Sequence, residues 1–279
     1  MKKSIVLCAD DYGQAPAISQ GIINLIEKGR LSATSCMVNS DYWAEHAKWL
    51  LPYQQQIDIG LHFNLTEGRA LSKEYQSRHG DHFQALGQVL RRAFTRSLSQ
   101  SAIEAELHAQ IDCFQDAMGQ PPRFVDGHQH VHQFPVVRTA LMRVYEQRLR
   151  SHHTYIRLVN EPLELRDFIQ SFKKVIIRMT GSWSLARMLQ KKKIPHNLSF
   201  TGIYSFAQAG HYPQLFMRFL ENINAAGLIM CHPGLSDLSG ADTIARSRFE
   251  EYQYFSSDQF IRDCQSQGVV IRCFDGLER

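Results

Sequence analysis

The chain has 279 residues, 44% of them hydrophobic, which suits one large α/β domain. Its net charge of +4 is too small to predict a nucleic-acid-binding protein, and no apolar run is long enough to span a membrane. The apolar run before Asp10 is too short for a signal peptide and the six cysteines form no C-x-x-C pair, so we expect a cytoplasmic protein with reduced cysteines.

Short apolar runs, typical of buried strands, alternate with amphipathic segments, typical of helices. In chain order the expected elements are strand Ser4–Ala9, helix Ala17–Lys28, strand Thr34–Val38, helix Tyr42–Leu51, strand Ile57–Leu61, helix Ser101–Met118, strand Arg123–Val125, helix Pro135–Arg150, helix Pro213–Ala226, strand Leu228–Cys231, helix Ser257–Gln267 and strand Val269–Cys273. Repeated strand–helix units predict a parallel sheet, and their number favours an irregular (β/α) barrel over an open sheet.

Two stretches lack a clear pattern. Residues 66–99 are polar and irregular, and a loop of this length is usually a lid or a binding loop. Residues 151–210 are poorly patterned, and 150–200 holds ten Lys and Arg against three Asp and Glu. Such a basic face is ordinarily solvated surface, and the alternatives are an anionic substrate, a lipid surface or a partner protein. The part at 172–193, with Trp183 and three successive lysines, is the candidate for peripheral membrane contact.

Residues that bind metals or transfer protons follow several of the expected strands. Asp10 and Asp11 follow the first strand, His62 follows the third, and His232 follows Leu228–Cys231. The carboxyl ends of parallel strands meet at one edge of the sheet, so these groups should lie close together. Because side chains alternate along a strand, one aspartate can bind a metal while the other acts as a base. The alternative for the pair is a cap on the helix that follows.

The densest cluster is Asp126-Gly-His-Gln-His-Val-His132, whose Asp126, His128, His130 and His132 share one face if the segment is extended. Not all of them can bind one ion, so some must orient a ligand or contact the substrate. Without a cysteine in the cluster, mixed oxygen and nitrogen ligands fit a catalytic divalent metal better than a structural zinc site.

Other residues are weaker candidates. Asn64 would share a face with His62 if that strand continues, and Arg157 and Arg248 could each hold a substrate oxygen or be surface arginines. His232 is placed to act as a general acid, to orient another group, or to be a buried structural histidine.

Four motifs together resemble the YdjC-like carbohydrate deacetylases, which include chitooligosaccharide deacetylases and the hopanoid-biosynthesis-associated type. The motifs are Ala9-Asp-Asp-Tyr-Gly13, Gly60-Leu-His-Phe63, Asp126-Gly-His-Gln-His-Val-His132 and Cys231-His-Pro-Gly234. The resemblance implies a distorted (β/α) barrel similar to polysaccharide deacetylases, with one divalent ion, magnesium or zinc. It implies that Asp11, His62 and His128 bind the metal.

The same resemblance implies further roles. Asp10 would be the general base, His232 the acid or a transition-state contact, and Asp126 would stand behind a ligand histidine. The residues expected around them, as supports or substrate contacts, are His130, His132, Asn64 and Arg157.

We therefore expect a single domain over residues 1–279, with a basic excursion around 150–210, that hydrolyses N-acetyl groups of an amino sugar in an oligosaccharide or a glycolipid. The basic excursion is unlike the chitooligosaccharide enzymes and leaves the rest of the substrate open. A homodimer is expected only by resemblance. The alternatives are a metal-dependent phosphoesterase on a similar barrel and a non-catalytic protein that binds sugar or metal.

Overall fold

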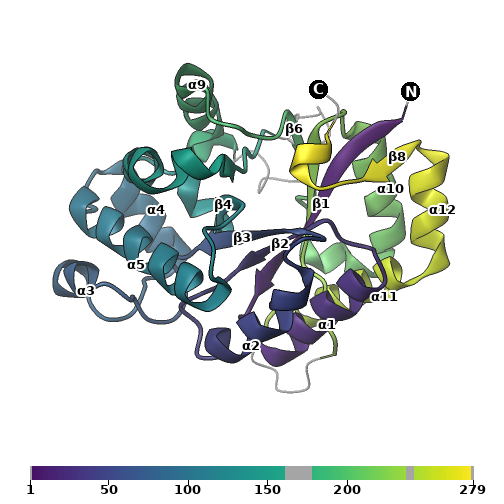
Figure 1. Ribbon diagram of the computed structural model, residues 1–279, viewed down its shortest axis with the longest axis horizontal. Coiled ribbons are helices and arrows are strands. Elements are labelled where there is room, and N and C mark those ends of the chain that lie inside the picture. The colour runs from purple at the N-terminus through teal and green to yellow at the C-terminus, as the bar shows by residue number, and fades with distance from the viewer. Residues whose placement is uncertain (1, 161–177, 237–241, 278–279) are drawn as a thin grey trace.

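The computed structural model describes residues 2–160, 178–236 and 242–277 (Figure 1). Within them, eight parallel strands form one curled sheet, in the order β5-β4-β3-β2-β1-β7-β6, with β8 also paired to β1. The strands are β1 Lys3–Tyr12, β2 Ala33–Cys36, β3 Asp58–Phe63, β4 Phe124–Gly127, β5 Tyr155–Ile156, β6 Ser199–Thr201, β7 Gly227–Cys231 and β8 Val269–Ile271. A single parallel bridge from Ile156 to His196 brings the two edges together, so the sheet is an incompletely closed barrel.

Helices cover the outer side of this sheet, with α3, α4 and α5 on the side of β3 and β4, and α10, α11 and α12 on the side of β8 (Figure 1). The α-helices are α1 Pro16–Glu27, α2 Trp43–Leu50, α3 Lys73–His79, α4 Leu86–Phe94, α5 Gln100–Met118, α6 Val137–Val144, α9 Trp183–Lys192, α10 Tyr212–Asn222, α11 Ala245–Ser256 and α12 Asp258–Ser266. Shorter helical turns are η1 Leu51–Tyr53, η2 His128–Gln133, η3 Tyr145–Leu149, η4 Arg150–His152, η5 Arg178–Ser182, η6 Phe206–His211 and η7 Phe274–Gly276.

The first strand–helix unit shows why the elements form where the pattern predicts them. Pro16 begins α1, a position that needs no backbone N–H, and Ile18, Ile22 and Leu25 lie on its buried face. Gly29 follows the helix with a positive φ of 64°, a conformation that glycine adopts without strain. The expected parallel α/β barrel is confirmed, with strand ends shifted by a few residues.

Two predictions about the helices are wrong. The expected loop at 66–99 contains α3 and α4, and α11 lies where no helix was expected. Only Tyr75 is buried in α3, and only Val89 and Ala93 in α4, so few apolar positions reveal a helical period. The buried face of α11 includes the polar residues Ser247, Arg248 and Glu251, and it therefore looks hydrophilic in the sequence.

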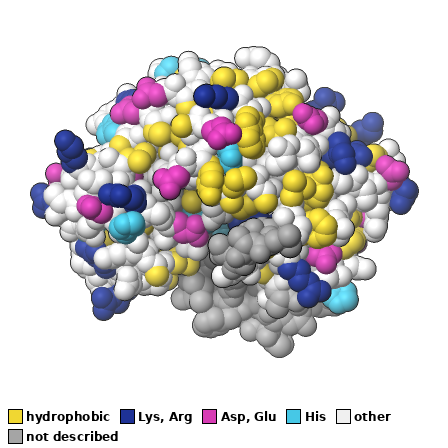
Figure 2. All heavy atoms as spheres, turned by 90° about the horizontal axis from the view of Figure 1, so that it is seen from below, with side chains coloured by type: hydrophobic (Ala, Val, Ile, Leu, Met, Phe, Trp, Pro, Cys, Tyr) yellow, Lys and Arg dark blue, Asp and Glu magenta, His cyan; other side chains and the backbone are white. Residues whose placement is uncertain are grey.

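The basic excursion is partly described. Its described part includes β5, α9 and β6, whereas residues 161–177, which hold the first part of the basic stretch at 172–193, lie outside the described residues. On the face shown in Figure 2, Lys and Arg side chains are interspersed with Asp and Glu side chains. No helix among the described residues is both long and apolar enough to cross a lipid bilayer.

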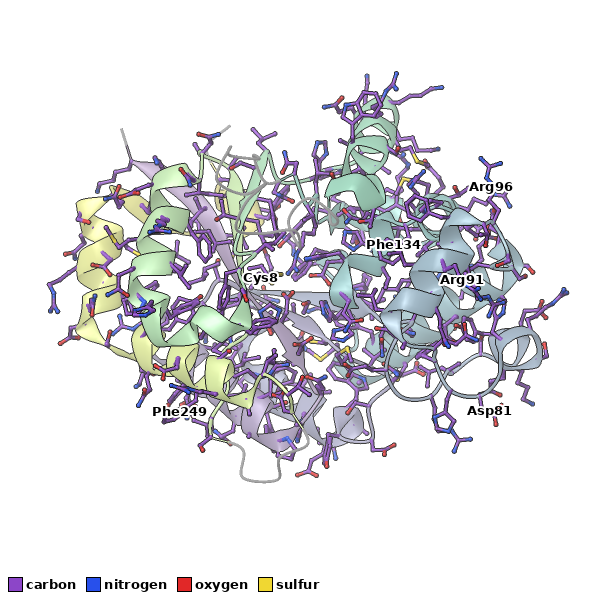
Figure 3. All side chains as sticks on the ribbon, turned by 180° about the vertical axis from the view of Figure 1, so that it is seen from behind. Cys8, Asp81, Arg91, Arg96, Phe134 and Phe249 are labelled. Atoms are coloured by element: carbon purple, nitrogen blue, oxygen red, sulfur yellow. The ribbon has the colours of Figure 1, made fainter. Side chains whose placement is uncertain are left out.

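The barrel interior holds a small apolar cluster. It includes Val6, Cys8, Phe124, Leu228 and Met230, whereas a larger cluster packs between the sheet and the helices. Cys8 lies in the middle of the sheet, while Arg91 and Arg96 project at the outside of the molecule (Figure 3). All six cysteines are unpaired, and Cys8, Cys36, Cys231 and Cys264 are buried. The interior near the beginnings of the strands is therefore lined by apolar side chains.

Candidate metal centre and active site

The inward-facing positions change from apolar to polar along the strands. In β1, Val6 and Cys8 are followed by Asp10, and in β4 Phe124 is followed by Asp126, all of them buried. The same column in β7 ends at Met230 and continues to His232 in the residue after the strand. Because the strands are parallel, these polar residues come together at the carboxyl end of the barrel.

Asp11 departs from this alternation. Its φ of 67° lies in the left-handed region, and the pairing of β1 with β2 slips in register between Ala9 and Tyr12. Aspartate is one of the few residues that tolerate this backbone conformation. The irregularity brings both Asp10 and Asp11 to the same cavity, whereas simple alternation predicts opposite directions.

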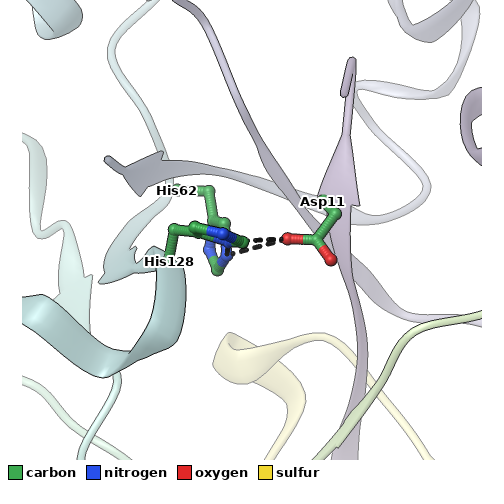
Figure 4. Close-up of side chains that lie close together, drawn as sticks. All are labelled: Asp11, His62 and His128. Carbon is green, nitrogen blue, oxygen red and sulfur yellow. Dashed lines mark hydrogen bonds and ion pairs between the residues drawn. The ribbon is translucent and has the colours of Figure 1, made fainter. Parts of the chain in front are cut away.

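Asp11, His62 and His128 form a tight triangle (Figure 4). Asp11 Oδ1 lies 3.0 Å from His128 Nδ1 and 3.3 Å from His62 Nε2, and the two ring nitrogens are 3.4 Å apart. All three side chains are buried. Metal–ligand bonds of about 2.1 Å in a tetrahedral site place neighbouring ligand atoms about 3.4 Å apart. Two imidazoles and one carboxylate at these distances fit a divalent ion.

His62 is held by a carboxylate on its far side. Asp126 Oδ1 lies 2.6 Å from His62 Nδ1, and Ser35 Oγ lies 3.0 Å from the same nitrogen. Burial opposes a charge on this ring, but Asp126 and Asp10 outweigh burial and raise the pKa of His62 to about 10. A carboxylate behind an imidazole sets its tautomer, so Nε2 is the atom presented to Asp11 and His128.

Asp10 is paired with a buried arginine. Both guanidinium NH groups of Arg157 donate to Asp10, each at 2.6 Å, and Arg157 NH2 also lies 2.6 Å from Asp126 Oδ2. Burial alone would raise the pKa of Asp10, but Arg157 outweighs burial and holds that pKa below its usual range. Asp10 is therefore ionised at neutral pH. Cys8, Asp10 and Asp126 also lie close together, but Arg157 donates to Cys8 and Asp10 and forms an ion pair with Asp126, so it supplies the cation there.

His232 faces the cavity from the end of β7. Its backbone N–H donates to Glu251 of α11, and Glu251 also accepts from the hydroxyl of Tyr204 at 2.6 Å. Burial lowers the pKa of His232 to about 4, although Asp11 and Asp10 oppose the shift. The ring is thus neutral at pH 7. The proton that His232 would deliver must reach it during the reaction.

The histidine cluster does not form an extended strand. After His128 the chain turns through η2, where Gln129 and His130 both have positive φ. The condition for four co-facial side chains therefore fails. His130 lines the cavity, whereas His132 is buried with Nε2 at 3.0 Å from the carbonyl oxygen of Arg157. Burial lowers the pKa of both rings, that of His132 to about 4, so both are neutral.

Arg248 is not a surface residue. It is buried, donates to Asp11 Oδ2 at 2.7 Å and to Asp242 Oδ2 at 2.7 Å, and thereby leaves Asp11 Oδ1 for the triangle. Burial alone would raise the pKa of Asp11, but Arg248 and His128 outweigh burial and hold that pKa well below its usual range. Both arginines considered in the sequence therefore hold an aspartate of the site.

Two further residues complete the site and carry no distinctive sequence signal. Glu67 Oε1 lies 3.1 Å from His128 Nε2, and Gln14 Nε2 donates to Glu67 Oε2 at 2.7 Å. Asn64, expected near the site, instead turns into the loop, where its Oδ1 accepts from the backbone N–H of Thr66 and Glu67.

A cavity of about 380 Å³ opens over these groups. Besides the polar groups, its lining includes the apolar or aromatic residues Ile203, Tyr204, Phe206 and Met230. The candidate site residues that line it are Asp10, Asp11, His62, His128, His130 and His232. Asp126, Arg157 and His132 stand behind them, so the cavity brings a candidate metal-binding triangle, an ionised carboxylate and a neutral imidazole to one space.

Comparisons with known proteins agree with this geometry. The profile of the YdjC-like protein family matches residues 4–266. A carbohydrate deacetylase of Danio rerio is 35% identical over 178 residues, covering 61% of this chain and 54% of the relative. A chitooligosaccharide deacetylase of Serratia marcescens is 36% identical over 140 residues, covering 49% and 53%. The chain thus spans about half the length of the curated relatives it matches.

Solved structures share the fold. A structure from Enterococcus faecalis, provisionally described as a cellobiose-phosphate cleavage protein, matches with a TM-score of 0.74 at 19% identity and covers 99% of this chain and 98% of its own. A peptidoglycan N-acetylglucosamine deacetylase matches with a TM-score of 0.51 at 9% identity, covering 97% and 86%. The barrel is therefore of the polysaccharide deacetylase type, and, because the family profile covers nearly all its residues, this chain belongs to the YdjC-like protein family.

Proposed function

We propose that this chain is a metal-dependent carbohydrate N-deacetylase that acts on an N-acetylated amino sugar. The observation that carries the proposal is the triangle of Asp11, His62 and His128, with Asp10 and His232 facing the same cavity. A pure metal or sugar binder needs no ionised carboxylate and imidazole beside its ligand set. The relatives named as carbohydrate and chitooligosaccharide deacetylases support the same class of reaction.

The proposed chemistry is amide hydrolysis with one divalent ion, magnesium or zinc. When bound, the ion would supply Lewis acidity toward the acetyl carbonyl and the attacking water. Asp10, held in place by Arg157, takes the proton of that water. Because His232 is neutral at the start, it first receives the proton that Asp10 accepted from the water and then donates that proton to the departing amine.

The first experiment measures acetate release from diacetylchitobiose and longer N-acetylated oligomers, with chelated protein and with single added ions. Metal-dependent release supports the proposal. A sample that binds metal but releases no acetate from these oligomers or from lipid-linked amino sugars contradicts it. Turnover of p-nitrophenyl phosphate with more than one ion per chain would favour the phosphoesterase alternative.

The partner of the basic excursion is a separate proposal. In α9, Trp183 is 69% exposed with Arg187 over its ring, and the lysines 191–193 at the other end of the helix are also exposed. An exposed indole beside several cations suits an anionic lipid surface. Co-sedimentation with phosphatidylserine vesicles, lost in Trp183→Ala, would support a peripheral contact. A homodimer remains a prediction, testable by light scattering.

A further inference from the structure

A closed circuit of polar contacts surrounds one side of the candidate metal centre. His128 Nε2 lies 3.1 Å from Glu67 Oε1, and Glu67 Oε2 accepts from Gln14 Nε2 at 2.7 Å. Gln14 Oε1 accepts from Arg248 at 3.0 Å, and Arg248 donates to Asp11 Oδ2 at 2.7 Å. Asp11 Oδ1 returns to His128 Nδ1 at 3.0 Å. Each candidate ligand in this circuit therefore has a partner on the side away from the triangle: Arg248 for Asp11 and Glu67 for His128.

Several side-chain amides hold the backbone of Glu67 in place. Asn64 Nδ2 donates to the Glu67 carbonyl at 2.7 Å, and Asn39 Nδ2 donates to the same oxygen at 3.0 Å. Asn64 is itself held by Gln110, which bonds both its N–H and its carbonyl. These hydrogen bonds hold the turn at residues 64–67, and the turn places the Glu67 carboxylate at the cavity wall.

The two histidines of the triangle each have a carboxylate on the far nitrogen. Asp126 stands behind His62 and is fully buried, whereas Glu67 stands behind His128 with 42% of its side chain exposed. The Glu67 approach is within ion-pair distance, but its angle is not that of an aligned hydrogen bond. A carboxylate on the far nitrogen favours the tautomer that leaves the near nitrogen free for a metal.

We propose that Glu67 is a positioning residue for His128, and that Gln14 fixes Glu67 in that role and joins it to Arg248. The proposal rests on the metal centre of the proposed function and not on its substrate. Glu67 would act through His128 alone, because its nearer oxygen faces the ring and its other oxygen is taken by Gln14.

The test measures the Kd for Co²⁺ of the full chain by titration calorimetry, together with the visible absorption of the bound ion. Glu67→Gln keeps the shape and removes the charge, and we expect its Kd to rise by about 10- to 100-fold with a changed cobalt spectrum. Glu74→Gln is the matched control, because Glu74 has the same 42% exposure and an ion pair with Arg78 away from the site. Its Kd should equal that of the unmodified chain.

A second variant tests the circuit itself. Gln14→Leu removes the bridge between Glu67 and Arg248, and we expect it to lose less cobalt affinity than Glu67→Gln does. In the double variant the two losses should not be additive, because both act through Glu67. The apparent Tm of the metal-free Glu67→Gln protein should stay unchanged, which separates positioning from folding. A Glu67→Gln protein that keeps the original Kd within twofold would overturn the proposal, as would a chain that binds no Co²⁺.

The outcome is separable from that of the proposed function. A tenfold loss of cobalt affinity in Glu67→Gln, with no acetate released by the unmodified chain, supports the positioning role and contradicts the deacetylase. Acetate release by the unmodified chain, together with an unchanged cobalt Kd in Glu67→Gln, supports the deacetylase and contradicts the positioning role of Glu67.

Discussion

At the scale of single residues, one backbone torsion separates the tasks of two neighbouring carboxylates. Asp10 follows the inward alternation of β1 and meets Arg157, whereas the positive φ of Asp11 turns its carboxylate toward His62 and Arg248. The two guanidinium groups keep both carboxylates ionised in a buried site, where burial alone would favour the neutral acids.

Replacing Asp10 tests its role as the base. Asp10→Asn should lower kcat by about 100- to 10,000-fold, because the amide cannot accept the proton of the attacking water. The bound metal should stay at the level of the unmodified protein, measured by elemental analysis. Arg157 keeps Asp126 as a partner, so the variant should fold. Turnover close to that of the unmodified protein would exclude Asp10 as the base.

At the scale of elements, α11 connects the end of β7 to the cavity wall. Glu251 accepts from the backbone of His232 and from Tyr204, and Gly234 N–H donates to the carbonyl of Arg248. A helix that was invisible as an apolar pattern therefore positions the general acid candidate, an arginine and an aromatic wall residue.

The carboxyl group of Glu251 should make stability depend on pH. Burial raises its pKa from 4.5 to about 7, although Tyr204 and the His232 N–H oppose the shift. Between these values the folded chain keeps a proton that the unfolded chain has released, so the Glu251 contribution to stability falls as pH rises through about 7. The urea midpoint of Glu251→Gln, relative to the unmodified protein, should rise between pH 5 and 8. Parallel pH profiles would contradict this assignment.

Two glycines in helices should respond in opposite directions to alanine. A Cβ on Gly21 of α1 would lie 2.9 Å from Gly234 Cα, in the loop after His232, whereas a Cβ on Gly87 of α4 meets no described atom within 4 Å. Gly87→Ala should add roughly 0.5–1 kcal/mol to the free energy of unfolding through helix propensity. Gly21→Ala should lower it by about 1–3 kcal/mol, because α1 must move from the loop. Equal effects in denaturant titrations would exclude a tight contact.

At the scale of the whole molecule, the centre joins parts that are distant in the chain. Asp11 lies near the end of β1, His62 lies in β3, and His128 begins η2, so an ion held by all three would connect three segments of the barrel. In the described residues, the edges of the sheet meet through the bridge between Ile156 and His196 and through hydrogen bonds between Leu158 and Asn197. An ion shared by three strands' ends would add a further connection across the barrel.

Metal should therefore raise the apparent Tm. At a free ion concentration 100 times Kd, binding to the folded state alone adds about 2.7 kcal/mol. For a chain of this size that corresponds to an increase of roughly 5–10 °C. Thermal melts of chelated protein with increasing Zn²⁺ or Mg²⁺ measure the effect, and His62→Ala should abolish it. An unchanged Tm at saturating metal would contradict binding at this centre.

Only some residues of the candidate site could be predicted from the sequence. Asp10, Asp11, His62, His128 and His232 stand out because reactive residue types follow apolar strands, and parallel strands bring such ends together. Glu67 and Gln14 give no such signal, because each lies in an ordinary polar turn. The neutral state of His232 also could not be predicted, since it depends on burial by residues distant in the chain.

The sequence by itself determined the parallel barrel, the order of most strands and helices, and the residues that gather at its carboxyl end, because apolar periodicity and strand ends are local properties. Only the tertiary structure decided which oxygen of Asp11 is free, which guanidinium holds each carboxylate, and that α3, α4 and α11 are helices. These features depend on contacts between distant segments: Arg248 lies 237 positions from Asp11, and the buried face of α11 is polar because its partners are polar.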